Sequence, residues 1–520
     1  GSKNRKTMKT MKKIFLATIL TVGIASASFA QVTPASVEVY KAQSLWFNSE
    51  NAAGLVITPL DRFNTLEALY DMKSGDFKSA QNGRNERELR IGTEGSTTLG
   101  KGYVLGSFNY KNTAQDSTLF NTIMLDPQMD MPYYYADPNM SFWRKQSFDM
   151  SFKASTKAFW DVLSFGITGT YNVKTGAKQI DPRCSNFKYD LDVKPGITAT
   201  FGNHSIGLTL LYTHAFERVS PINANSQESQ DVAVMRGLGN QTIGVIGSLS
   251  SLGTMYYNSN KIGGAFQYGF KSSEVALLLE GWHTFAVLDA NQTPSKPQKM
   301  GTTIKQNIGG KGQITFGDKN LSKISLSGNY RNTDGVEYIQ EIDKRYEVQQ
   351  WVTIVQNIRS TYRTLNATAA YDFFRLCDKG YNWKAGVNGA FYYEKDKYIY
   401  PASSFEAKNF YAGAEVAKNF FVKKSVIAAD LNAGYRKNLD GSYIYGGPMA
   451  DSPYVNFFKM ENELLTADYL QAGANLSFTF PVTSKMMMSV KGAYTIMKAS
   501  ETTLLGNVRH AVTAGVSFTF

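Results

Sequence analysis

The 520-residue chain carries 55 Lys and Arg against 43 Asp and Glu, a net charge of +12 that falls to +6 without the six basic residues of its first thirty positions. So small a surplus, with acids and bases interleaved, excludes the basic footprint of a nucleic-acid-binding protein. Tyr and Phe are abundant (30 and 32), Pro is rare (14), and no linker divides the chain, which favours one large domain over several.

The first thirty residues have the order of a secretory signal peptide. Basic residues precede an apolar run from Ile14 to Ala25, and Ser28-Phe29-Ala30 forms a small-x-small cleavage site. The run is short for a membrane-spanning helix, which needs about 20 apolar residues. We therefore predict a signal peptide over residues 1–30, removed after Ala30. In the oxidising compartment beyond, Cys184 and Cys377, which lack metal-site spacing, form either one disulfide or two free thiols.

Residues 31–60 precede the regular strand pattern and form either a periplasmic leader or a small plug. The stretch Leu45-Trp-Phe-Asn-Ser-Glu-Asn-Ala-Ala-Gly-Leu55 is similar to the N-terminal hatch of long-chain fatty-acid transporters, which contains Asn-Pro-Ala. Ala52 stands here in place of the proline. The resemblance implies that Trp46, Asn51 and Gly54 belong to a plug.

From residue 61 onward the dominant pattern is alternation with a period of two. Between Leu163 and Val173 the bulky apolar residues take odd positions and the small or polar residues take even ones, and the pattern returns over 189–201 and 470–480. Such stretches are strands with two chemically different faces. A soluble sandwich would alternate too, but its strands usually have about 5 to 6 residues. The runs here match the roughly 9 to 11 residues of a tilted transmembrane strand.

Tight turns and long loops join these runs alternately, as in outer-membrane barrels. Candidate tight turns lie near 100–101, 155–156, 202–203, 271–272, 318–320, 378–380, 418–423 and 481–485, and longer connections near 115–141, 217–255, 289–300, 335–350 and 441–462. We predict an all-β, transmembrane antiparallel barrel over residues 61–520 in the bacterial outer membrane, with short periplasmic turns and long extracellular loops. The segments number 18, with 16 as the alternative.

Two places depart from this regular pattern. Segment 345–376 is longer than one membrane crossing. Pro195 lies inside an alternating run, where a proline removes a ladder hydrogen bond. We expect a bulge at Pro195 or a position near the water interface, because an unpaired backbone group is costly in hydrocarbon.

Charged residues on the polar strand faces should point into the lumen, because Lys or Arg at the lipid midplane costs about 2 to 4 kcal/mol. The candidate lumen residues are Asp190, Asp192, Lys194, Glu280, Glu394, Asp430, Arg436 and Lys491. Their mixed signs predict little ion selectivity. They either line a solute path or simply hydrate and brace the lumen.

Aromatic residues gather in two loops that are candidate contact surfaces for sugars or a partner protein. The candidates are Tyr133, Tyr134 and Tyr135 in the loop from Met129 to Pro138, and Tyr443, Tyr445, Tyr454, Phe457 and Phe458 between 441 and 459. Alternatively, they are girdle residues at the headgroup level, or the loops pack on one another. The glycine-rich loop over 217–255 is long enough to fold inward and narrow a pore.

The last strand places Val512, Ala514, Val516, Phe518 and Phe520 on one face. It resembles the C-terminal signal strand of outer-membrane barrels, which implies recognition by the barrel-assembly machinery. With the segment 63–77 and the run after Glu86, the chain resembles the outer-membrane barrel families of unknown function found in Gram-negative gut anaerobes. Genes of such families often stand near TonB-dependent transporters and surface lipoproteins, so the resemblance implies a lipid-embedded accessory of nutrient or metal uptake.

No catalytic motif stands out in the sequence. His204, His214, His283 and His510 fall in a proposed turn or near strand ends, where interfacial histidines are common, and neither His-Glu-x-x-His, Gly-x-Ser-x-Gly nor Cys-x-x-Cys occurs. We expect no enzyme, cofactor or metal. A pore or transport component for small solutes is the favoured function. The alternatives are a non-conducting scaffold that docks a surface lipoprotein or a TonB-dependent transporter, and an outer-membrane hydrolase.

Overall fold

A computed structural model describes residues 32–59, 62–124, 131–225, 227–247, 251–293, 296–345, 347 and 349–520. The predicted signal peptide lies outside these residues, as do positions 129 and 130 of the first aromatic loop. The helices of the described chain are short, and none of them has the length and apolar character needed to span a bilayer.

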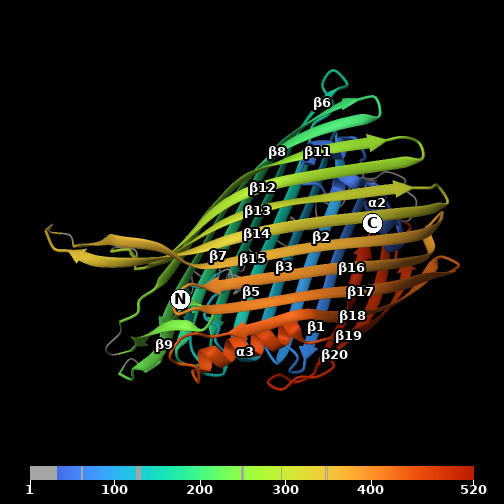
Figure 1. Ribbon diagram of the computed structural model, residues 1–520. Coiled ribbons are helices and arrows are strands. Elements are labelled where there is room, and N and C mark those ends of the chain that lie inside the picture. The colour runs from blue at the N-terminus through green and yellow to red at the C-terminus, as the bar shows by residue number, and fades with distance from the viewer. Residues whose placement is uncertain are drawn as a thin grey trace, which may run out of the picture.

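In the described chain, eighteen antiparallel strands form one closed sheet (Figure 1). They are β1 (Phe63–Ser74), β2 (Asn85–Leu99), β3 (Gly102–Thr118), β5 (Ser141–Ser155), β6 (Leu163–Lys178), β7 (Arg183–Phe201), β8 (His204–Ile222), β11 (Met255–Lys271), β12 (Val275–Gln292), β13 (Gln298–Phe316), β14 (Asn320–Asp343), β15 (Gln350–Cys377), β16 (Gly380–Tyr398), β17 (Ser403–Val422), β18 (Ser425–Ile444), β19 (Tyr469–Pro481), β20 (Met487–Ala499) and β21 (Val508–Thr519). The predicted fold class and the favoured count of 18 are confirmed.

The first and last strands close the ring. β1 pairs with β21 from Thr65 opposite Thr519 to Ser74 opposite His510. The pairing continues into the C-terminal residue, because the Phe520 N–H donates to the Asn64 carbonyl at 3.0 Å and the Asn64 N–H donates back at 2.8 Å. A closed ring leaves no strand edge that lacks backbone partners in the hydrocarbon.

The two ends of the barrel differ in their connections. At one end, called here the turn end, short links such as 100–101, 202–203 and 423–424 join neighbouring strands; at the other, the loop end, the links include 119–140, 223–254 and 445–468. The predicted alternation of turns and loops is confirmed. The β5–β6 link at the turn end is longer than expected, since it covers 156–162.

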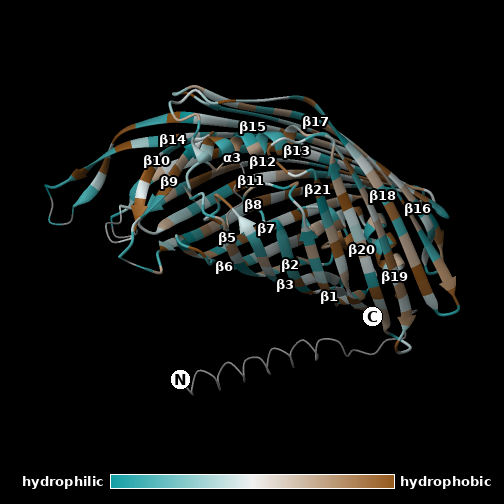
Figure 2. Cartoon of the chain, turned by 90° about the horizontal axis from the view of Figure 1, so that it is seen from below, coloured by the Kyte–Doolittle hydropathy of each residue, from teal (hydrophilic) through white to brown (hydrophobic). Residues whose placement is uncertain are grey.

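Apolar side chains point outward and polar ones inward along the strands. On β8, Ile206, Leu208 and Leu210 are exposed on the outside, whereas Ser205 and Thr209 are buried inside. Hydrophobic and hydrophilic positions alternate along most strands in Figure 2. An apolar belt around a closed barrel is suited to hydrocarbon. The chain is therefore an integral barrel of the outer-membrane type.

The two predicted irregularities have different outcomes. At Pro195 no bulge forms: Val193 pairs with Tyr212 and Gly196 with Thr209, so the register is kept while the β7–β8 ladder skips two residues. β14 and β15 are long because they continue past the barrel as a two-stranded hairpin. β14 pairs with β13 up to Val336, and β15 pairs with β16 from Ser360 onward.

Smaller elements occupy both ends of the barrel (Figure 1). At the turn end lie α2 (Pro34–Gln43) and the 3-10 helices η1 (Leu45–Asn48) and η2 (Ala52–Val56); Thr33 starts α2 with a capping box and Pro34 follows as its first residue. At the loop end, β4 (Tyr135–Ala136), β9 (Gln230–Gly237) and β10 (Asn240–Ile246) form a small sheet beside α3 (Pro453–Thr466). Residues 32–59 are called the plug below, and the small sheet with α3 and residues 119–124 and 131–140 is called the cap.

Candidate functional site

The eight candidate lumen residues all lie on the inward phase of their strands. Asp192 accepts a hydrogen bond from Thr170 at 2.6 Å, and Lys188 pairs with Asp190 at 2.7 Å. Lys491 pairs with Glu67 at 2.9 Å. Of the other candidates, Lys194 and Glu280 contact the plug, and Arg436 contacts α3 of the cap. Glu394 lines a cavity beside the cap, and Asp430 lies on β18 opposite Asn475 of β19. Charged side chains of the barrel wall therefore contact both the plug and the cap.

Ion pairs join the plug to the barrel wall from several sides. Glu50 of the plug pairs with Lys194 at 2.8 Å, Glu38 pairs with Lys384 at 3.2 Å, and Lys41 pairs with Glu94. Burial tends to raise the pKa of Glu50, but Lys194, Lys311 and Lys153 lower it more, so the pKa lies below its ordinary value. Glu50 thus stays charged beside these lysines.

Backbone groups of the plug are bound by wall side chains as well. Lys153 donates to the carbonyls of Phe47 and Ser49 at 2.7 and 2.9 Å, and Lys311 donates to that of Asn48 at 2.6 Å. The carboxylate of Glu280 accepts from the Ser49 hydroxyl at 2.5 Å and from the Glu50 N–H at 3.1 Å. Lysines and a glutamate from β5, β12 and β13 therefore converge on residues 47–50.

Asn51, Trp46 and Gly54, the three residues of the hatch resemblance, all lie inside the plug. Asn51 is fully buried; its amide group donates to the Ile197 carbonyl and to Gln267, both at 3.0 Å, and its side-chain oxygen caps η2. A Cβ on Gly54 would lie 1.9 Å from the Trp46 ring. The ring and the backbone of η2 therefore pack in direct contact.

Glycines of the barrel wall make room for the plug. A Cβ on Gly166 would lie 2.1 Å from the Ala53 nitrogen, one on Gly196 would lie 2.2 Å from Asn51, and one on Gly380 would lie 2.6 Å from the Ala35 carbonyl carbon. Gly166 and Gly196 lie opposite each other on the neighbouring strands β6 and β7, whereas Gly380 lies at the start of β16 on another part of the ring. The plug and wall are complementary in shape as well as in charge.

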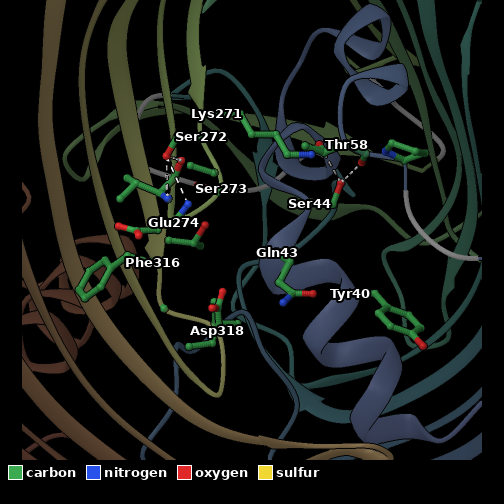
Figure 3. A pocket seen from close by; sticks show the side chains of 16 residues that line it. Tyr40, Gln43, Ser44, Thr58, Lys271, Ser272, Ser273, Glu274, Phe316 and Asp318 are labelled. Atoms are coloured by element: carbon green, nitrogen blue, oxygen red, sulfur yellow. Dashed lines mark hydrogen bonds between the residues drawn. The ribbon is translucent and has the colours of Figure 1, made fainter. Parts of the chain in front are cut away.

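A polar cavity of about 510 Å³ remains beside the plug at the turn end (Figure 3). Tyr40, Gln43 and Ser44 line one side, and the β11–β12 turn with Lys271 and Glu274 lines the other. The cavity therefore separates the plug from one part of the wall at the turn end.

The aromatic loop residues are not the exposed contact surface that their sequence suggested. Tyr133, Tyr134, Tyr135, Tyr454, Phe457 and Phe458 are buried, and Tyr443 and Tyr445 are half-buried. Phe120 packs against Phe457 with ring centroids 5.0 Å apart, and the Tyr257 hydroxyl donates to the Tyr133 carbonyl at 3.0 Å. The rings lie inside because the loops fold inward and pack on one another, the arrangement that was the alternative interpretation.

The cap spans the mouth of the barrel from wall to wall. Its apolar cluster includes Trp143 of β5 and Val219 of β8 on one side and Phe405 of β17 on the other. Arg236 of β9 pairs with Glu337 of β14 at 2.8 Å. The glycine-rich loop supplies β9 and β10 to this layer, consistent with the expected inward fold.

The two cysteines are not bonded to each other. Cys184 lies in the same apolar cluster as a free thiol, and Cys377 at the turn end is also free.

The C-terminus of α3 is held by two charged side chains. Arg436, a candidate lumen residue, donates to the carbonyls of Leu464 and Ala467 at 2.5 and 2.7 Å and stacks on Tyr469. Glu463 accepts hydrogen bonds from the backbone of Leu504 and Leu505, both at 2.8 Å. A cation at a helix C-terminus is favourable because the last carbonyls lack partners within the helix.

Residues 52–520 match a family of unknown function, DUF6850. The chain belongs to this family. The matched residues contain the whole barrel, the cap and η2, whereas α2 and η1 precede them. No functionally curated protein matches the sequence.

Among solved structures, this DUF6850 chain is similar to the ferric preacinetobactin receptor BauA of Acinetobacter baumannii (8% identity, TM-score 0.38, 88% of this chain and 80% of that one). It is also similar to the outer-membrane transporter YddB of Escherichia coli (9%, 0.40, 88% and 81%) and to the Escherichia coli ferric-catecholate import receptor Fiu (7%, 0.40, 88% and 82%). At these values the likeness is one of barrel architecture.

Several residues that build the site were not singled out from the sequence. Lys153 and Lys311, which hold the plug backbone, belong to the inward phase of alternating runs, so their direction could have been predicted. Glu461 lies in the predicted connection 441–462 and Glu463 lies just after it, so neither belongs to a predicted strand. Ser452 followed by Pro453 is a helix-start signal that could have revealed α3.

Proposed function

We propose that the protein is a gated solute-transport component of the outer membrane, closed at rest at both ends. The observation that carries this proposal is the plug, whose Glu50, Glu38 and Lys41 pair with charged wall residues. A barrel that served only as a scaffold could fill its lumen with apolar side chains. Here the polar contacts can be exchanged for water, because a hydrogen bond to protein replaces one to water at a net gain of only about 0.5 to 1.5 kcal/mol.

The contacts that close the loop end are apolar, unlike the polar contacts of the plug. The cap is an apolar cluster, so opening it exposes rings and aliphatic side chains to water. We infer that solute enters through a displacement of cap elements and leaves through a displacement of the plug. An 18-strand wall is wide enough for an aqueous passage once both inner structures have moved.

Conductance across planar bilayers tests this proposal. Four forms of the processed protein are compared: the intact chain, a chain lacking residues 32–59, a chain with 224–253 replaced by a short Gly-Ser linker, and one carrying both changes. Only the doubly changed barrel should give sustained current steps. Circular dichroism confirms that each form is folded. Sustained current from the intact chain would indicate an open pore, and silence from the folded double variant would contradict transport.

The hairpin beyond the barrel favours a second candidate, an accessory subunit that docks a surface lipoprotein or a TonB-dependent transporter. Past Val336 and before Ser360 the two strands of the described chain pair only with each other. Exposed apolar side chains cover them: Ile339, Ile342, Val352, Ile354, Val355 and Ile358. An isolated two-stranded hairpin is marginally stable in water, and exposed apolar patches often mark interaction sites.

Co-purification from native membranes tests the accessory role. Replacing residues 338–356 by Asn-Gly shortens the hairpin to a two-residue turn between the paired residues Glu337 and Asn357. A docked partner should then be lost while the barrel remains folded. Ile354→Ser should weaken recovery of the partner, and Ile243→Ser, at an exposed isoleucine of the cap, is the matched control. Equal recovery from all forms would rule out the hairpin as the docking element.

A further inference from the structure

A cavity of about 240 Å³ lies between the cap and the wall. Five separate parts of the chain line it: the β1–β2 loop near Gln81, the aromatic loop at Tyr134, β9 at Met235, β16 at Glu394, and α3 at Glu461. None of the plug residues contributes. The cavity is thus distinct from the polar cavity at the turn end, and it lies directly beneath the cap.

One wall of the cavity carries negative charge. Glu461 accepts hydrogen bonds from the Ser79 hydroxyl at 2.7 Å and from the Ala80 N–H at 3.0 Å, and both go to its Oε1. Among the described residues no hydrogen bond reaches Oε2, and Glu461 is one of the residues that line the cavity. Glu394 adds a second carboxylate. The nearby Lys78 does not line the cavity, and its ammonium donates to the carbonyls of Ser79 and Asn82.

Aromatic and aliphatic side chains line the rest of the cavity, several of them from the same helix, α3, that carries Glu461. Phe457, Phe458 and Tyr134 contribute rings, and Leu465 and Met235 contribute apolar chains. Aromatic faces attract organic cations, and apolar surface attracts the carbon body of a ligand. Such a wall does not suit a hydrated metal ion, and the described residues hold no group of three or more His, Cys, Asp or Glu that could bind one.

The volume limits the size of a ligand. A cavity of about 150 Å³ binds benzene, and drug-sized molecules occupy about 300 to 1,000 Å³. At about 240 Å³, the space holds one ring or a short branched chain with a charged arm.

From the cavity's size, its Glu461 carboxylate and its aromatic wall, we infer that it is a binding site for a small organic ammonium ion, such as an arylalkylamine. The ammonium group binds Oε2 of Glu461, and the carbon body packs on Phe457, Phe458 and Leu465. The interpretation of this ligand as a transported solute rests on the proposed function. Binding of the ligand in the cavity does not depend on that function.

Equilibrium binding to the detergent-solubilised, full-length processed protein tests the inference, with phenethylamine and its neutral analogue 2-phenylethanol as probes. The amine should bind at least about tenfold more tightly than the alcohol, since a charge-assisted hydrogen bond is stronger than a neutral one. In Glu461→Gln this preference should vanish. In Glu501→Gln, a change at an exposed glutamate of the β20–β21 link outside the cavity, the preference should remain.

A variant whose larger side chain fills the cavity provides the second measurement. Leu465→Trp should abolish saturable binding of both probes, which separates the cavity from detergent or surface binding. The inference is wrong if the intact protein shows no saturable amine binding or binds the alcohol equally well. It is also wrong if Glu461→Gln keeps the preference. A positive binding result with no conductance from the doubly opened barrel would retain the site and reject transport.

Discussion

At the scale of single residues, glycines of the barrel wall help to position the plug because they have no side chain. Gly166, Gly196 and Gly380 leave space that backbone or amide atoms of the plug fill. Protein interiors tolerate added volume poorly, because neighbouring atoms are already in contact. The plug's place in the barrel is therefore encoded in wall strands that lie far from it in sequence.

Gly166→Ala should loosen the plug while leaving the barrel intact. The added Cβ would meet the Ala53 nitrogen, a backbone atom that moves only with the whole of η2. Overpacking of this kind costs about 1 to 3 kcal/mol. Hydrogen exchange of amides 50–56 should become faster. Gly264→Ala is the control, since its nearest neighbour would be 3.7 Å away; equal effects of the two changes would refute the role of Gly166.

At the scale of elements, α3 is the part of the cap whose position depends most on charged groups. Arg436 binds its last carbonyls, and Glu463 binds the 503–505 backbone. Glu461 faces the cavity, and burial raises its pKa above the ordinary 4.5. The helix therefore responds to both charge removal and pH.

Arg436→Met should release the C-terminal turn of α3. The change removes hydrogen bonds from a charged donor, each worth about 1.5 to 3 kcal/mol, and leaves the Leu464 and Ala467 carbonyls without that partner. Amides 460–468 should lose protection against hydrogen exchange. Lys459→Met, on the exposed face of the same helix, should leave them protected. Unchanged protection in Arg436→Met would show that the apolar cluster alone holds the helix.

The pH dependence of α3 should pass through a maximum. Because the folded pKa of Glu461 is raised, proton uptake favours the folded helix, and stability rises as pH falls from above that pKa toward 4.5. Burial tends to raise the pKa of Glu463, but hydrogen bonds from Thr503, Leu504 and Leu505 lower it below 4.5, so its contribution is lost at lower pH. Exchange protection corrected for intrinsic rates measures the curve. Glu461→Gln should remove the rise, and Glu463→Gln should remove the acid-side loss.

Wall elements could be predicted from the sequence in more detail than the inner elements could. A strand between lipid and a polar lumen needs alternating side chains, so the segment near Thr65 was recognisable as β1 from its own residues. The buried run Tyr133-Tyr134-Tyr135 follows no such period, because its surroundings come from β9, β11 and α3. Partners distant in sequence decide whether those rings are buried.

At the scale of the whole molecule, closure depends on the last residues meeting the first strand. Phe520 exchanges backbone hydrogen bonds with Asn64, and Phe518 lies opposite Leu66. The resemblance of this strand to an assembly signal implies a second role before closure. The predicted assembly role involves the same terminal residues as closure.

Removal of Phe520 should reduce the amount of closed barrel in the outer membrane several-fold. The shortened chain loses the final hydrogen-bonded pair with Asn64 and its terminal aromatic residue. Quantitative membrane fractionation measures the yield. Phe201→Ala, at an exposed aromatic end of β7, is the matched control. A normal yield without Phe520 would show that the preceding alternation suffices.

The contacts between Gly166, Gly196, Gly380 and the plug also constrain how such proteins can diverge. A lineage that loses residues 32–59 removes the atoms those glycines accommodate, and larger residues then become acceptable at all three positions. A lineage that keeps the segment can enlarge one of them only with a compensating change in the segment itself. The residue size found at these three positions in related chains should therefore indicate whether an ancestral barrel contained the plug.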